Sequence, residues 1–180
     1  MTKADLAAHS ILDSKLTPLL PSCPVVSEED INSMAHRKTK GLFWLIDPLD
    51  GTKEFISGSY EFTVNIALIK DRKPLLGVVY APAIDALYWG GEGLGAYRRI
   101  GKRTATLKVD ALPYRSEYRV IVSRSHMNKL TESFIARLGT VSVIQAGSSL
   151  KFCKVAEGSA DIYPRLAPTR EWDTAAGHAV

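Results

Sequence analysis

Two aspartates three positions apart carry the strongest chemical signal in this sequence. Asp47 and Asp50 belong to the segment Asp47-Pro48-Leu49-Asp50-Gly51-Thr52, which follows an apolar run at residues 42–46. The run predicts a buried strand, and Pro48 fixes the turn between the two acids. Residues 53–56 predict a short helix whose first N–H groups suit a phosphate. Carboxylate oxygens beside an anion site are what Mg²⁺-assisted phosphoryl chemistry requires.

Further acidic residues decide between this chemistry and an ordinary turn. An isolated Asp-x-x-Asp pair is more often a turn former or a helix cap. Here Asp5, Glu28-Glu29 and Asp173 each fall at the end of a predicted element as well. Two divalent cations held close together need several shared carboxylates, and no single short segment supplies them. The hypothesis of a metal site therefore depends on the set of acids.

The first two thirds of the chain predict a helix followed by an antiparallel sheet. Apolar residues at helical spacing indicate a helix over residues 5–20, and a short strand follows at 25–26. Residues 31–41 are expected to form a polar loop. Beyond the Asp47–Thr52 motif, strand-like runs cover residues 62–69, 75–80, 86–89 and 95–98. Their short connections predict an antiparallel meander.

The pattern changes near residue 115, where strands and helices alternate. Strands are predicted at 118–122, 140–144 and 160–163, with helices at 126–138 and 148–157. Such alternation favours a small α/β unit. We therefore divide the chain into residues 1–114, a metal-binding part with the antiparallel sheet, and residues 115–180, a smaller α/β substrate part.

Composition limits the kind of protein. The 180 residues carry a formal net charge of +4 and include 46% hydrophobic residues, an ordinary globular balance. No dense basic stripe with interleaved aromatics supports nucleic-acid binding. Two cysteines without metal-ligand spacing predict free thiols in a reducing compartment. With neither a signal peptide nor a transmembrane segment visible, we expect a cytoplasmic protein, with peripheral association at the inner membrane as an alternative.

Two segments resemble the signatures of the inositol monophosphatase superfamily, the lithium-sensitive, Mg²⁺-dependent phosphomonoesterases. They are Asp47–Thr52 and Glu171-Trp172-Asp173-Thr174-Ala175-Ala176-Gly177. Thr2–Asp5 and Ser27–Glu29 also match elements of that family, so the resemblance covers nearly the whole chain. It implies the layered αβαβα sandwich of the sugar phosphatases, an α/β fold, and two or three Mg²⁺ ions as cofactors.

The resemblance also implies a role for each matching residue. Asp5 and Thr52 would position and deprotonate the attacking water. Gly51 and Thr52 would hold the phosphate through backbone N–H groups. The metal ligands would be the carboxylates of four residues and one backbone carbonyl: Glu28, Asp47, Asp50, Asp173 and, through its carbonyl, Leu49. In-line attack by water, without a covalent phosphoenzyme, is the implied mechanism.

Finer features favour one branch, the bacterial 3'(2'),5'-bisphosphate nucleotidases of the CysQ type. The segment Ser123-Arg124-Ser125-His126 is similar to their segment that meets the second phosphate, and Arg124 would bind it bidentately. Residues 147–153 resemble their nucleotide-side helix, with Ser148 and Lys151 as contacts. Glu171 before Trp172 favours the same branch. The implied reaction removes the 3'-phosphate of adenosine 3',5'-bisphosphate to give AMP. Arg124 and Lys151 remain open to the alternative of ordinary surface residues.

The ends of the chain depart from the family pattern. Met1 begins almost on the first matching element, and the chain stops at Val180, soon after Asp173. We therefore expect a chain truncated at both ends, with a short final helix that holds Asp173 weakly. The loss of an N-terminal helix would expose an apolar face and favour a homo-oligomer.

Three alternatives remain at this point. The haloacid dehalogenase phosphatases also use an Asp-Gly-Thr motif, but their two aspartates are two positions apart and the first is a nucleophile. A second alternative keeps the mechanism and changes the substrate to inositol monophosphate or another sugar phosphate. The third is an inactive fragment that acts only as a folded binding domain.

Overall fold

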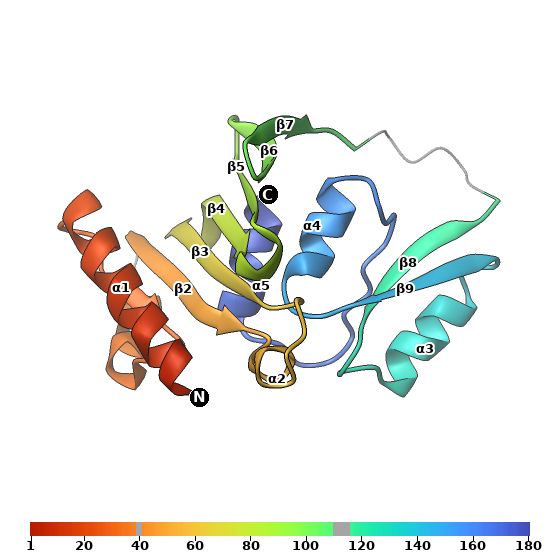
Figure 1. Ribbon diagram of the computed structural model, residues 1–180, viewed down its shortest axis with the longest axis horizontal. Coiled ribbons are helices and arrows are strands. Elements are labelled where there is room, and N and C mark those ends of the chain that lie inside the picture. Colours follow the sequence, from red (N-terminus) through yellow and green to blue (C-terminus); the bar gives the residue numbers. More distant parts are fainter. Residues whose placement is uncertain (39–40, 110–115) are drawn as a thin grey trace.

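The computed structural model describes residues 1–38, 41–109 and 116–180. Within these ranges it forms five layers in the order helix, sheet, helices, sheet, helix (Figure 1). The αβαβα sandwich predicted from the sequence is thereby confirmed. The predicted boundary at residues 114/115 lies outside the described residues, so the division into two parts stays a prediction.

The larger sheet has seven strands in sequence order. They are β1 (Val25–Ser27), β2 (Leu42–Asp50), β3 (Thr63–Lys70), β4 (Lys73–Ala81), β5 (Ala86–Gly91), β6 (Gly95–Ile100) and β7 (Arg103–Leu107). Strand β1 runs parallel to β2, and each later strand is antiparallel to the one before it. The meander is as predicted, except that the sequence did not predict β7. Four of the five side chains of β7 are exposed, so this strand has no apolar face to indicate it.

Helices cover the two faces of this sheet. Helix α1 (Lys3–Leu19) packs against β2 on one face, while α5 (Glu171–Ala179) packs across β2, β3 and β4 on the other. The approach of α5 is close at Gly77, where a Cβ atom would lie 2.2 Å from the carbonyl oxygen of Ala176. Any larger residue at position 77 would therefore push α5 off the sheet.

A second, two-stranded sheet lies on the far side of α4 (Leu150–Ala156) and α5, as Figure 1 shows. Its strands β8 (Tyr118–Ser123) and β9 (Val141–Ala146) are parallel and are joined through α3 (Lys129–Ala136). The strand predicted at 160–163 is reduced to one bridge between Val120 and Ile162. Helix α3 begins later than predicted because Asn128 caps it.

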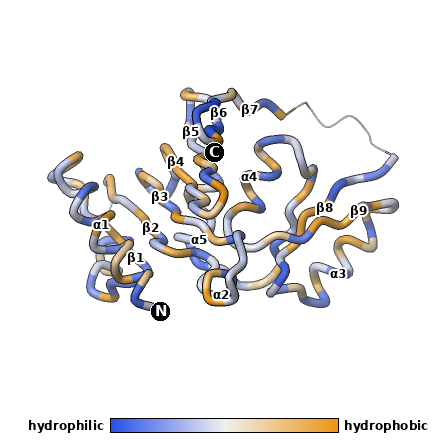
Figure 2. Tube along the Cα trace, in the orientation of Figure 1, coloured by the Kyte–Doolittle hydropathy of each residue, from blue (hydrophilic) through white to orange (hydrophobic). Residues whose placement is uncertain are grey.

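Three short elements complete the fold: η1 (Ile31–Lys38), α2 (Thr52–Ile56) and η2 (Pro82–Ile84). A 3₁₀ helix thus replaces the polar loop predicted from residue 31. Figure 2 shows apolar stretches along β8 and β9. The largest apolar cluster lies between the seven-stranded sheet and helices α4 and α5. No helix in the described ranges is long and apolar enough to cross a membrane.

Strand β2 is longer than predicted, since it continues through Asp50 instead of turning at Asp47. Its partner β1 ends opposite Ile46, so Pro48 lies where one edge of β2 has no strand to pair with. A proline, which lacks an N–H group, is tolerated at such a position. The pairing with β3 shifts register between Asp47 and Asp50, which turns the end of β2 toward the cavity described next.

Candidate active site

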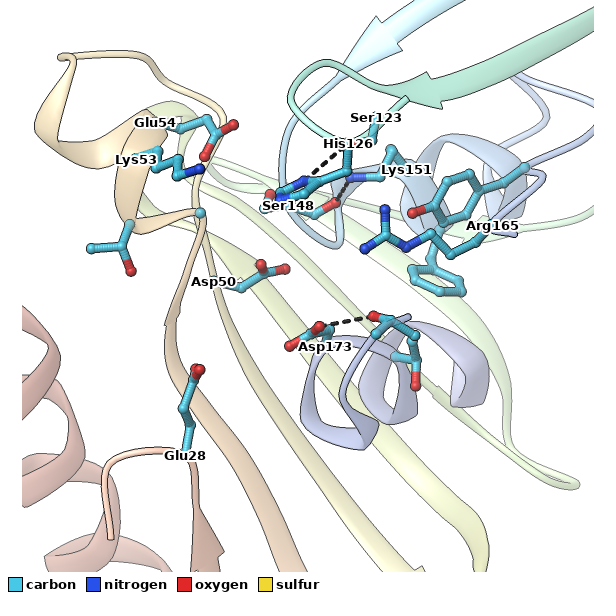
Figure 3. Close-up of a pocket in the computed structure, with 16 residues that line it drawn as sticks. Glu28, Asp50, Lys53, Glu54, Ser123, His126, Ser148, Lys151, Arg165 and Asp173 are labelled. Carbon is cyan, nitrogen blue, oxygen red and sulfur yellow. Dashed lines mark hydrogen bonds between the residues drawn. The ribbon is translucent and has the colours of Figure 1, made fainter. Parts of the chain in front are cut away.

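A cavity of about 330 Å³ opens where several elements end (Figure 3). Its lining comes from the ends of β1, β2 and β8, from the first turns of α2, α4 and α5, and from the segment before α5. The lining residues are Glu28, Asp50, Gly51, Thr52, Lys53, Glu54, Ser123, His126, Ser148, Lys151, Phe152, Tyr163, Arg165, Thr169, Asp173 and Thr174.

Acidic side chains line one side of this cavity. Figure 3 shows Glu28, Asp50 and Asp173 around its floor. Asp47, three positions before Asp50, is buried. Burial raises the pKa of Asp47 well above its usual range, and the charges of Asp50, Glu28 and Asp173 raise it further. Burial and Asp173 likewise raise the pKa of Asp50, to about 6. The acids therefore repel one another when ionised, a situation that a bound cation would relieve.

The backbone of the motif is shaped by local bonds. Asp47 Oδ1 accepts a hydrogen bond from the backbone N–H of Leu49 at 3.0 Å. Gly51 adopts a φ of 89°, a left-handed conformation that favours glycine. The strand can therefore pass directly into α2, with the carbonyl oxygen of Leu49 3.3 Å from Thr52 Oγ1.

The expected Asp5–Thr52 pair is in contact at the edge of the cavity. The Thr52 hydroxyl lies 3.3 Å from Asp5 Oδ1 as well as from the Leu49 carbonyl oxygen. Burial would raise the pKa of Asp5, but hydrogen bonds from Thr2 and Thr52 outweigh it and lower that pKa. Asp5 is thus a charged acceptor at neutral pH, aimed at the Thr52 hydroxyl. It caps its own helix at the same time, since its carboxylate accepts the backbone N–H of Thr2.

Positive charge faces the acids from the opposite wall. Lys151 is buried in α4, where its ammonium group bonds to the carbonyl oxygen of Ser148 and lies 5.4 Å from the centre of the Tyr163 ring. Burial lowers the pKa of Lys151, while the charge of Asp50 opposes that change. Arg165 also points into the cavity in Figure 3, and one of its terminal nitrogens donates to the carbonyl oxygen of Pro168 at 3.0 Å.

Five residues expected at the site lie outside the cavity lining: Asp5, Asp47 and Leu49, which lie next to lining residues of the motif, and Arg124 and Glu171, which are paired elsewhere. Arg124 forms a two-bonded ion pair with Glu61, both N–O distances being 3.1 Å, and Glu61 also accepts the backbone N–H of Gly147 at 2.9 Å. Glu171 pairs with Arg37, which lies over the ring of Trp172. Both belong to surface ion pairs that fasten neighbouring elements together.

Several lining residues were not singled out from the sequence. Lys53 and Glu54 directly follow the motif, so their position in the cavity lining could have been expected. His126 belongs to the segment that resembled a phosphate-binding element, and its ring lies 3.3 Å from Ser123 Oγ. Tyr163, Arg165 and Thr169 had no local signal, because they come from an irregular segment positioned only by tertiary packing.

The donor chemistry suits Mg²⁺, although the carboxylates stand apart. In the described part of the chain, no three His, Cys, Asp or Glu side chains form a group that would hold a metal ion as they lie. Asp173 Oδ2 is engaged by the Thr169 hydroxyl at 2.8 Å and by the backbone N–H of Arg170 at 3.0 Å. The acids nevertheless present hard oxygens to one cavity, and neighbouring carboxylates help to raise the pKa of Glu28, Asp47 and Asp50, so a divalent cation fits their charge.

Comparison with known proteins agrees with this fold. The profile of the inositol monophosphatase family matches residues 1–180. The 3'(2'),5'-bisphosphate nucleotidases CysQ of Salmonella typhimurium and Escherichia coli K12 are each 48% identical over 180 residues, all of this chain and 72% of theirs. The crystal structure of CysQ from Bacteroides thetaiotaomicron superposes with a TM-score of 0.82 at 42% identity, covering 97% of this chain and 70% of that one.

The fold and the cavity define an α/β sandwich protein with an acidic site that faces a cationic wall. The chain belongs to the inositol monophosphatase family.

Proposed function

We propose that this protein is a Mg²⁺-dependent 3'(2'),5'-bisphosphate nucleotidase that hydrolyses the 3'-phosphate of adenosine 3',5'-bisphosphate to AMP and phosphate. The single observation that carries the proposal is the cavity in which Glu28, Asp50 and Asp173 face Lys151 and Arg165. Similarity over this whole chain and 72% of the length of nucleotidases named CysQ supports the choice of substrate.

The acids would form the metal-binding half of the site. Glu28, Asp50 and Asp173 would be joined by the buried Asp47 and by the carbonyl oxygen of Leu49. Bound Mg²⁺ would polarise the phosphoryl oxygens and lower the pKa of water. We propose two or three Mg²⁺ ions, a number compatible with the number of acids.

The Asp5–Thr52 pair would move the proton of the attacking water. A Thr hydroxyl can donate one hydrogen bond while it accepts another. If Thr52 donates to Asp5, its lone pairs remain available to a water in the cavity. The proton of that water would pass to Thr52 Oγ1 as the proton of Thr52 passes to Asp5 Oδ1, which the lowered pKa of Asp5 keeps ionised beforehand. Gly51 and Thr52 would hold the phosphate through backbone N–H groups.

The cationic wall would recognise the second phosphate and the nucleoside. Lys151, Ser148 and Ser123 line it, and Arg165 adds a guanidinium group that can bind a phosphate bidentately. Arg124 would reach a ligand only by leaving Glu61, so the geometry favours Arg165 for direct contact. Glu171, which is paired with Arg37, would act on the site through its neighbour Trp172.

A comparison of substrates tests the proposal. Phosphate release would be measured with adenosine 3',5'-bisphosphate and with inositol 1-phosphate, each with Mg²⁺ and with EDTA. We expect Mg²⁺-dependent release, with the higher kcat/KM for the bisphosphate. A higher kcat/KM for inositol 1-phosphate would refute the substrate, and a trapped aspartyl-phosphate would refute attack by water.

The proposal includes a cytoplasmic location. Cys23 and Cys153 are both free thiols in the core. Burial raises the pKa of both thiols, so neither is activated for chemistry. Free buried cysteines are typical of proteins from reducing compartments.

A further inference from the structure

A buried series of hydrogen bonds links two residues of strand β3, through the residue before helix α4, to Asp50. Thr63 and Asn65 are two residues apart on β3, so their side chains lie on the same face of the sheet. That face meets Ser149, the residue before α4. Thr63, Asn65 and Ser149 are all at most 1% exposed.

The distances define the chain. Thr63 Oγ1 lies 2.8 Å from Ser149 Oγ, and Ser149 Oγ donates to Asn65 Oδ1 at 2.6 Å. The amide nitrogen of Asn65 then donates to Asp50 Oδ2 at 3.3 Å.

The donor and acceptor of every hydrogen bond follow from Asp50, the last residue of the series. An ionised carboxylate only accepts, so Asn65 must turn its N–H₂ group toward Asp50 and its carbonyl oxygen toward Ser149. Ser149 has one hydroxyl proton and gives it to that oxygen, which leaves Thr63 as the donor to Ser149. All three links therefore point the same way, and each bond polarises the next.

We propose that Asn65, fixed by Ser149 and Thr63, is a positioning residue that holds Asp50 in the orientation needed to bind Mg²⁺. This inference rests on the proposed function. Asn65 occupies one oxygen of Asp50 and leaves the other for the cavity. An asparagine on a buried strand is unfavourable unless its groups are paired, and apolar residues would fill the same space.

The same hydrogen bonds connect the acidic side of the site to its cationic side. Ser149 lies between Ser148 and the turn that carries Lys151, so the hydrogen bonds that orient Asp50 also fix the start of α4. The backbone N–H of Ser149 favours the charged form of Asp50 in addition. A change in these hydrogen bonds should therefore weaken Mg²⁺ binding first and substrate binding second, whereas Lys151→Ala should mainly weaken substrate binding.

The test measures Mg²⁺ binding directly, by calorimetric titration without substrate, together with kcat and KM. Loss of an outer partner of a metal ligand typically weakens affinity about 10- to 100-fold. We expect Asn65→Leu to raise the Kd for Mg²⁺ by about that factor. Ser149→Ala and Thr63→Val should raise it progressively less, and Thr63→Ser should retain the affinity of the parent protein.

A control separates positioning from general loss of stability. Tyr88→Phe removes another buried hydroxyl, which donates to Glu157 Oε2 at 3.0 Å, away from the cavity. It should lower the free energy of unfolding without changing the Kd for Mg²⁺. If Asn65→Leu does not fold, the pair Thr63→Val and Thr63→Ser decides the question by the same measurement.

Equal Mg²⁺ affinity in the parent protein and all folded variants of the chain would overturn the proposal, as would a parent protein that does not bind Mg²⁺. Mg²⁺ binding that weakens as predicted in a protein that releases no phosphate from adenosine 3',5'-bisphosphate would support the positioning role and reject the proposed function.

Discussion

Replacing Asp50 by asparagine should remove activity and at the same time stabilise the metal-free protein. Asp50 is surrounded by other acids, and its pKa is raised from 3.8 to about 6, first by burial and then by the charge of Asp173. Asparagine has the same shape and can still accept the hydrogen bond from Asn65. The substitution therefore removes the unfavourable charge and leaves the packing in place.

The magnitude follows from the pKa. One pKa unit corresponds to about 1.4 kcal/mol, so the ionised carboxylate destabilises the folded protein by about 3 kcal/mol relative to the unfolded chain. Lys151 loses a favourable neighbour in the variant, which offsets part of this gain. We expect Asp50→Asn to raise the free energy of unfolding by about 1 to 3 kcal/mol at pH 8 in EDTA. For a chain of this length that is a rise in Tm of about 2–4 °C per kcal/mol.

The sign of the pH dependence is fixed by the same shift. A carboxyl group whose pKa is raised on folding destabilises the fold as it ionises, progressively between about pH 4 and pH 6. Well below pH 4 it is protonated in both states, so the advantage of the variant should shrink as the pH falls from 8 to 4 and then disappear. Mg²⁺ should stabilise the parent protein and not the variant, because only the parent retains the ligand.

The assay is urea unfolding followed by tryptophan fluorescence at pH 4 and pH 8, in EDTA and in Mg²⁺. Asp13→Asn, on the exposed side of α1, removes the same charge far from the cavity and serves as the control. A variant that is less stable than the parent protein at pH 8 in EDTA would refute the reasoning. A gain of equal size at both pH values would refute it too, and so would near-normal turnover.

Three further predictions concern the proton path, the substrate and the scaffold. Thr52→Val should lower kcat by about 10²- to 10⁴-fold in steady-state assays, with Mg²⁺ affinity retained, because it removes the hydroxyl that faces Asp5. Lys151→Ala should mainly raise KM for the bisphosphate, and an unchanged KM would exclude it from the substrate site. Glu157→Gln should lower the free energy of unfolding by about 1–3 kcal/mol in urea, because Arg98 at 2.6 Å and Lys154 at 2.8 Å lose their shared carboxylate. A variant as stable as the parent would show that this ion pair contributes nothing.

The sequence predicted the layers because their signals are local. The apolar run before Asp47, the short meander connections and the strand–helix alternation after residue 115 each reflect periodicity over a few residues. The motifs at 47–52 and 171–177 fall at element ends, and the structure brings them to one cavity. The prediction of a strand at 160–163 was wrong. The apolar residues there pack into the core, but only one β-bridge, between Ile162 and Val120, forms.

What the sequence did not predict depends on partners far apart along the chain. Arg124 pairs with Glu61, 63 positions earlier, and nothing near either residue indicates the ion pair. Asn65 and Ser149 are 84 positions apart, and each taken alone is an unremarked polar residue in an apolar element. Arg165 reaches the cavity from an irregular segment without periodicity. Such contacts are set by how the layers pack, so they become visible only in three dimensions.

The most direct test of the proposed activity is phosphate release from adenosine 3',5'-bisphosphate by the purified 180-residue chain, first with Mg²⁺ and then with EDTA. We predict release with Mg²⁺, with AMP as the nucleoside product, and its loss when EDTA is added. A folded sample that releases no phosphate with Mg²⁺, or that releases it equally well in EDTA, would contradict the proposal.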